Sequence, residues 1–164
     1  MAGYDTFVSP DVVRRTRPLV TMVTVLLGMW LFGNLYEEIV WIPRLIAHPR
    51  AGTLVEAFAP GSPVYYYLPW IPVAVALAGL LRLRFGALVP SRIRRSWTGA
   101  IGALAVAMAG KAFLIIEVNP VFRDPAATTR LVHDRAILWA SCNGAVIVAV
   151  ATALVLLRVT PRLR

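Results

Sequence analysis

Uncharged apolar stretches of membrane-spanning length alternate with polar segments along this chain. The clearest stretch runs from Leu19 to Trp41, and residues 19–33 within it contain no charged side chain. At a rise of about 1.5 Å per residue, a helix over this stretch is roughly 34 Å long, which is enough to cross a hydrocarbon core of about 30 Å. The pattern therefore predicts a first membrane-spanning helix over about 19–41.

Three more apolar stretches predict helices over about 65–83, 97–118 and 136–157. Prolines and mixed charges over 42–64 and 119–135 predict loops, the first of them with a short interfacial helix over 53–58. No internal repeat is apparent. We expect residues 1–164 to form a single integral membrane domain: an all-α, up-down bundle of four transmembrane helices with short connections.

Composition agrees with a membrane protein. Hydrophobic residues make up 59% of the chain, against about 45–50% in soluble domains. The mean hydropathy is +0.70. Cys142 is the only cysteine, which excludes an intrachain disulfide and a cysteine-based zinc site.

The net charge of +9 comes almost entirely from arginines that bracket the apolar stretches. The segment 82–96 carries five arginines and no acid, and the first 18 residues and the last seven carry three each. The positive-inside rule then predicts that both termini and the middle segment are cytoplasmic. We interpret the arginines as topology signals and phospholipid contacts in a bacterial cytoplasmic membrane, with no nucleic-acid partner.

Polar residues interrupt the apolar stretches near one end only. Under this topology, Asn34, Glu37 and Glu38 lie in the outer part of the first helix, and Lys111 lies near the outer end of the third. A carboxylate near the centre of a membrane helix costs on the order of 2.5–3.5 kcal/mol to insert, so two adjacent ones indicate a function. We predict a polar pocket in the outer half, open toward the outer leaflet.

Glu38, Glu37 and Lys111 are the predicted catalytic residues. A carboxylate can act as general acid or base, and a lysine can stabilise a developing enolate or alkoxide. A structural ion pair between Lys111 and one glutamate is the alternative, and which glutamate faces the pocket is left open. The predicted substrate-contacting residues are Asn34, Trp41, Tyr67, Trp70, Asn119, Arg135, Trp139 and Asn143.

We expect no metal and no cofactor. His48 and His133, with nearby carboxylates, are the alternative metal ligands. Neither histidine has a second histidine or a glutamate at the spacing that places two ligands on one face of a helix.

Short motifs in the second half resemble the anthrone oxygenase-like family of small four-helix membrane proteins. They are Asn119–Pro120 at the end of the third helix, followed by Trp139 and Asn143 early in the fourth. The resemblance covers about 20–157. It implies a four-helix membrane fold and a cofactor-free oxygenation, in which a base forms a carbanion that O2 attacks.

These observations favour a membrane enzyme that acts on a lipophilic, polyketide- or terpenoid-like small molecule. Carboxylate acid/base chemistry would serve isomerisation or cyclisation, and the resemblance adds oxygenation. The alternative is a non-catalytic membrane subunit or assembly partner of a larger complex. A small-solute transporter or proton relay is less favoured, because the inner halves of the helices carry no polar path. Membrane lipids are expected contacts, and a homo-oligomer is possible.

Overall fold

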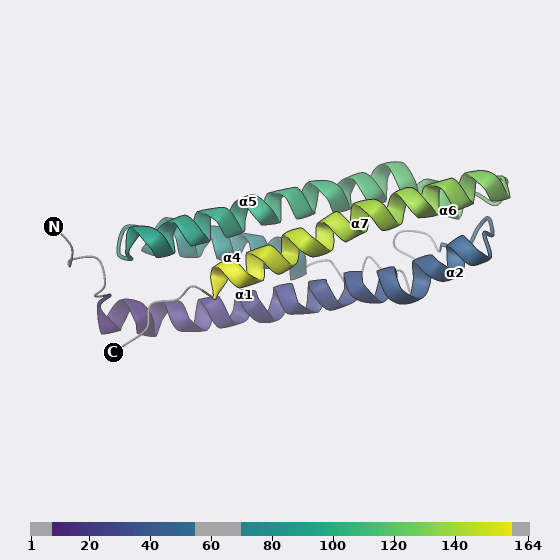
Figure 1. Ribbon diagram of the computed structural model, residues 1–164. Coiled ribbons are helices and arrows are strands. Elements are labelled where there is room, and N and C mark those ends of the chain that lie inside the picture. The colour runs from purple at the N-terminus through teal and green to yellow at the C-terminus, as the bar shows by residue number, and fades with distance from the viewer. Residues whose placement is uncertain (1–7, 55–69, 159–164) are drawn as a thin grey trace.

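Long helices run side by side along the molecule in the computed structural model, which describes residues 8–54 and 70–158 (Figure 1). The longer helices are α1 (Pro10–Tyr36), α4 (Trp70–Phe85), α5 (Ser91–Phe113) and α7 (Thr129–Leu157). No strand occurs within these described residues. The predicted all-α class is therefore confirmed.

The first helix is longer at both ends than the apolar pattern predicts. It begins at Pro10, because Ser9 Oγ accepts a hydrogen bond from the backbone N–H of Asp11 and proline fits the first turn. Beyond α1 it continues as a π-helical turn, η1 (Glu37–Trp41), and then as α2 (Ile42–Ala47). The beginning of the predicted loop 42–64 is thus helical.

The third helix has the same composite form. α5 begins at Ser91 rather than at about 97, after Pro90 in the N-cap position. It continues as a second π-helical turn, η2 (Leu114–Val118), and as the short α6 (Asn119–Arg123). The predicted loop therefore starts later than 119.

The last helix begins at Thr129 rather than at about 136. Thr128 caps it, since its Oγ1 accepts a hydrogen bond from the backbone N–H of Leu131 at 3.3 Å. The segment 130–135 was expected in a loop because four of its residues are polar. It instead forms helical turns that extend α7 beyond its apolar part, and within it Val132 is fully buried.

Among the described residues, three helical segments are long and apolar enough to cross a membrane: Pro10–Ala47, Ser91–Arg123 and Thr129–Leu157. The described part of α4 has 16 residues, fewer than the approximately 20 that span a hydrocarbon core. It ends at Phe85, close to the predicted end at 83. The predicted start at 65 and the predicted interfacial helix, of which only 53 and 54 are described, fall largely or wholly outside the described residues.

The four longer helices form a ring in which α1 and α5 stand opposite each other. Each of these two packs on α4 and on α7, and they do not pack on one another. α1 begins and α7 ends at the end of the bundle where α4 turns into α5 (Figure 1). Neighbouring helices are therefore antiparallel.

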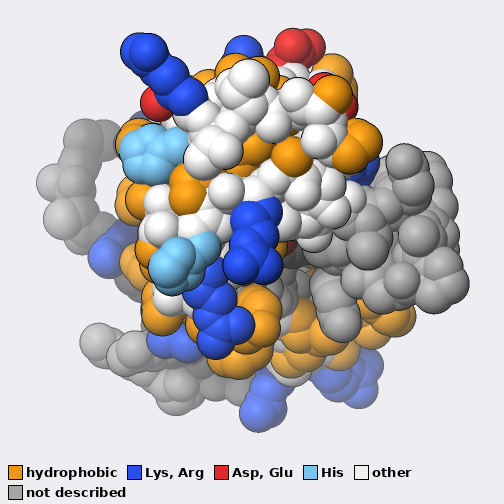
Figure 2. Space-filling view, turned by 90° about the vertical axis from the view of Figure 1, so that its right-hand side faces the viewer, with side chains coloured by type: hydrophobic (Ala, Val, Ile, Leu, Met, Phe, Trp, Pro, Cys, Tyr) orange, Lys and Arg blue, Asp and Glu red, His pale blue; other side chains and the backbone are white. Residues whose placement is uncertain are grey.

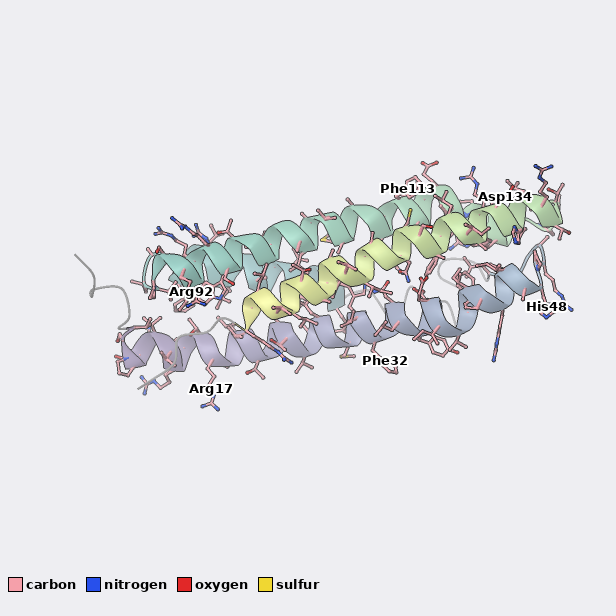
Figure 3. All side chains as sticks on the ribbon, in the orientation of Figure 1. Arg17, Phe32, His48, Arg92, Phe113 and Asp134 are labelled. Carbon is pink, nitrogen blue, oxygen red and sulfur yellow. The ribbon has the colours of Figure 1, made fainter. Side chains whose placement is uncertain are left out.

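The two ends of the bundle differ in charge. Arg17 and Arg92 lie at one end, called here the basic end, and His48 and Asp134 lie near the other (Figure 3). Seen from the second end, the surface carries basic, acidic and histidine side chains together (Figure 2). Phe32 and Phe113 point away from the bundle, as side chains in contact with lipid would (Figure 3).

Two separate apolar clusters make up the core. The large apolar cluster fills the basic-end part of the bundle, and its largest members include Leu27, Trp30, Trp97 and Leu104. The small apolar cluster lies toward the opposite end and consists of Ile42, Leu45, Leu114, Val118, Phe122, Val132, Ala136 and Trp139. The buried polar side chains Asn34, Lys111 and Asn143 lie between the two clusters.

The same order of helical elements occurs in the segment from α1 to α2 and in the segment from α5 to α6. No repeat was expected from the sequence. The offset is 77 residues, the separation of Asn34 and Lys111. Each π-helical turn begins three residues after one of these two positions, and Pro43 or Pro120 follows each turn at the same distance. The buried positions recur too: Thr16, Val23, Leu27, Trp30 and Asn34 match Ile93, Ala100, Leu104, Ala107 and Lys111.

Candidate functional site

A layer of five polar side chains crosses the bundle between the two apolar clusters. It consists of Asn34, Glu37, Glu38, Lys111 and Asn143, called here the polar layer. Lys111 Nζ lies at its centre and donates to Glu37 Oε2 at 2.6 Å, Asn34 Oδ1 at 2.9 Å and Asn143 Oδ1 at 3.3 Å. Residues far apart in the sequence are thus joined through one ammonium group.

Lys111 spans the interior of the ring. It leaves α5 and reaches the α1 side, so its long side chain bridges two helices that do not pack on each other. Its side chain is 8% exposed and that of Glu37 is 13% exposed. A charge in such surroundings needs a partner, because water cannot solvate it. The Lys111–Glu37 pair provides one for each ion.

Glu38 is held in a different way. Asn143 Nδ2 donates to Glu38 Oε2 at 3.0 Å and to the backbone oxygen of Asn34 at 3.1 Å. Asn34 Nδ2 in turn donates to the backbone oxygen of Trp30 at 2.8 Å. Glu37 therefore contacts an ammonium, whereas Glu38 contacts a neutral amide. The layer holds two carboxylates and one ammonium, and one added proton would neutralise it.

Aromatic rings cover the layer on the side away from the basic end. Lys111 Nζ lies 4.8 Å from the ring centroid of Trp139, a cation–π distance. Trp139 Nε1 donates to Asn119 Oδ1 at 3.1 Å. Trp41 packs edge-to-face on Trp139 and on Phe122. The small apolar cluster lies between the polar layer and the end toward which the sequence predicts an opening.

Both π-helical turns lie next to the polar layer. The backbone N–H of Ile42 bonds to the oxygen of Glu37, and that of Asn119 bonds to the oxygen of Leu114, each across five residues. Such turns are rare, and they occur frequently at functional sites. Neither π-helical turn was predicted from the sequence. The available signal was an X-Pro pair nine residues after each of Asn34 and Lys111, at Pro43 and Pro120.

The structure brings most of the predicted site residues together. The residues in or against the polar layer are Asn34, Glu37, Glu38, Trp41, Lys111, Asn119, Trp139 and Asn143. Arg135 is half-buried on α7 but makes no hydrogen bond or ion pair with the layer in the part of the chain that is described. Trp70 is 44% exposed at the start of α4, and Tyr67 lies outside the described residues.

Histidines and carboxylates do not gather into a metal site anywhere in residues 8–54 and 70–158. His133 Nδ1 lies 3.6 Å from Asp134 Oδ1, and the two side chains are 41% and 61% exposed. His48 is exposed after α2. A shallow apolar groove runs along α1 from Arg17 to Leu26, toward the basic end and away from the polar layer.

Two buried indole groups were not singled out by sequence reasoning. Trp30 Nε1 and Trp97 Nε1 are buried, and neither finds a hydrogen-bond partner in the described part of the chain. Most buried polar groups are paired, so each exception needs an explanation. Neither indole could have been recognised from the sequence, because a tryptophan in an apolar helix fits the core equally well.

Comparisons with protein-family models, with curated proteins and with solved structures find no match to this chain. A function therefore has to be argued from the polar layer itself.

Proposed function

We propose that this chain is a membrane enzyme that acts on a lipophilic, polyketide- or terpenoid-like small molecule, with Glu38 as its general acid or base. The observation that supports it is that two adjacent, half-buried carboxylates have different hydrogen-bond partners. Lys111 donates to Glu37 at 2.6 Å, while Glu38 accepts from the Asn143 amide and interacts electrostatically with the Lys111 charge. A carboxylate held in place by an amide can accept and return a proton.

The other residues of the layer have complementary roles in this proposal. Glu38 removes a proton from a carbon next to a carbonyl, and Lys111 stabilises the resulting enolate oxygen. Return of the proton at another carbon completes an isomerisation, and attack of the carbanion on the same molecule gives a cyclisation. Neither needs an oxidant. Attack on O2 is the third outcome, the one that the family resemblance implies.

A non-catalytic membrane subunit is the second candidate. The observation that favours it is that the residues of the polar layer bond to one another. Lys111 donates to Asn34, Glu37 and Asn143, all within this chain, and such bonds can simply hold helices together. Interhelical hydrogen bonds in membranes contribute about 0.6 kcal/mol each, a modest gain for burying three charges.

Conversion of substrate tests the proposal. Membranes that contain the protein, and matched membranes without it, are incubated with a panel of lipophilic ketones and polyketide-type phenols. We expect one product that depends on the protein. An isomer of unchanged mass indicates isomerisation or cyclisation, and incorporation of oxygen from labelled O2 indicates oxygenation. If no product depends on the protein, the hypothesis of a non-catalytic membrane subunit is favoured.

For the orientation, we propose four membrane spans, α4 included, with both termini cytoplasmic. The basis is the arginines at the basic end, such as Arg17 and Arg92. Single cysteines are introduced at Thr53, Ala126 and Leu88 in a Cys142→Ala background. An impermeant thiol reagent added to intact cells should label the first two and miss Leu88→Cys, in the turn between α4 and α5. If Leu88→Cys alone is labelled, the orientation is the reverse of the one proposed.

A further inference from the structure

Trp30 carries a buried donor one helical turn from the polar layer, on its basic-end side. It lies one helical turn from Asn34 on the same face of α1, and its backbone oxygen accepts the Asn34 side chain at 2.8 Å. Its indole ring is 2% exposed, yet Nε1 has no partner among the described residues. The side chains of the polar layer are all hydrogen-bonded, and among the described residues of α1 Trp30 Nε1 is the buried side-chain donor that has no partner.

The position of Trp30 differs between the two halves of the repeat. Ala107 is the counterpart of Trp30 in α5 and is fully buried. α1 and α5 face each other across the ring, so a large indole stands opposite a single methyl group on the basic-end side of the layer. A ligand bound at this level of the bundle would therefore find an apolar residue on α5 and, on α1, a hydrogen-bond donor that is unpaired among the described residues.

We propose that Trp30 Nε1 donates a hydrogen bond to an acceptor oxygen of the ligand bound in the polar layer. The ligand class is then a lipophilic molecule with a carbonyl oxygen, rather than a hydrocarbon or an amine. This inference rests on the proposed function, since an enolate-forming substrate carries such an oxygen. A buried water molecule is the alternative acceptor for this N–H. The experiment distinguishes a ligand oxygen from a water oxygen.

Trp97 provides a matched control. Its indole N–H is also buried without a partner in the described part of the chain, but it belongs to α5 near the basic end, far along the helix from Lys111. Any general effect of a solute or of detergent on buried indoles should appear equally at both residues. An effect confined to Trp30 therefore reports binding at the polar layer.

The experiment follows the indole N–H resonances of the full chain, labelled with ¹⁵N-tryptophan and held in lipid nanodiscs. The probes are 1-tetralone and tetralin, a ketone and the hydrocarbon of the same ring system. We expect 1-tetralone to shift the Trp30 resonance and to leave Trp97 unchanged, and tetralin to shift neither. Trp30→Phe should weaken 1-tetralone binding about tenfold, the size of one lost hydrogen bond, and Trp97→Phe should not.

Two results would overturn the proposal. If the ketone leaves the Trp30 resonance in place, or if both probes move it equally, Trp30 does not donate to a carbonyl oxygen. Cross-relaxation of this N–H with a long-lived water that persists in the presence of 1-tetralone would assign the donor to water. Protein-dependent conversion of a substrate together with an unresponsive Trp30 would leave the proposed function standing and remove only this inference.

Discussion

Glu38→Gln is expected to lower turnover by about 10²–10⁴-fold, the usual contribution of a general acid or base. Glutamine keeps the shape of the side chain, and its amide oxygen can still accept from Asn143 Nδ2, which now bonds Glu38 at 3.0 Å. The negative charge and the exchangeable proton are lost. The rate of product formation in nanodiscs, measured at saturating substrate, checks the prediction.

Glu117→Gln is the control for this variant. Glu117 is a glutamate in the second π-helical turn, η2, but its side chain is exposed. The same chemical change there should leave turnover within about twofold of the original, because surface substitutions away from special features have small effects. Full activity in Glu38→Gln would remove Glu38 from the chemistry.

Lys111→Met is expected to give the largest loss of stability. Methionine fills much of the same space but leaves Glu37 without the ammonium that lies 2.6 Å away. Removing one partner of a buried ion pair costs about 3–5 kcal/mol, because the remaining charge is buried and unpaired. The free energy of unfolding, measured by denaturant titration in detergent micelles, should fall by this amount.

Two further variants make this prediction specific. Arg95→Met is the same kind of change on the same helix at an exposed site, and it should alter stability by no more than about 0.5 kcal/mol. Glu37→Leu added to Lys111→Met removes the orphaned charge and should restore most of the loss. A Lys111→Met protein as stable as the original would mean that the ion pair does not form.

The residues of the polar layer could be predicted from the sequence, but their hydrogen-bond partners could not. Carboxylates and a lysine inside apolar helices need partners, so Glu38 or Glu37 was expected to meet Lys111 in the bundle. Helical spacing could not say which glutamate faces the lysine, since positions three and four residues after Asn34 lie on nearly the same face. The structure shows Glu37 on the ammonium and Glu38 on Asn143.

The helix ends were harder to predict because apolar length alone does not mark them. Ser9 and Thr128 cap helices that begin in polar sequence, well before the apolar stretches start. The X-Pro pairs at Pro43 and Pro120 look like breaks in the sequence. Each instead lies in the first turn after a π-helical turn, where a missing N–H does little harm.

The repeat could not be recognised from residue types, because it is carried mainly by burial and backbone geometry. Arg15 and Arg92, Gly33 and Gly110, and Pro43 and Pro120 are among the few identical pairs at the 77-residue offset. At the polar layer the counterparts differ most: Glu37 and Glu38 match Leu114 and Ile115. One half of the molecule thus carries carboxylates where the other half is apolar.

This difference offers the most direct test of the central claim, that the polar layer serves chemistry and not the stability of the bundle. The variant Glu37→Leu/Glu38→Ile/Lys111→Asn gives each half the residues of its counterpart. Leucine and isoleucine replace two of the ions by apolar groups, and asparagine replaces the third by a neutral amide. Replacing a complete set of buried ions by neutral, packed groups is often neutral or stabilising by about 1–4 kcal/mol. We expect the free energy of unfolding of this variant to equal or exceed that of the original protein. A decrease of several kcal/mol would contradict it and show that the layer holds the helices together.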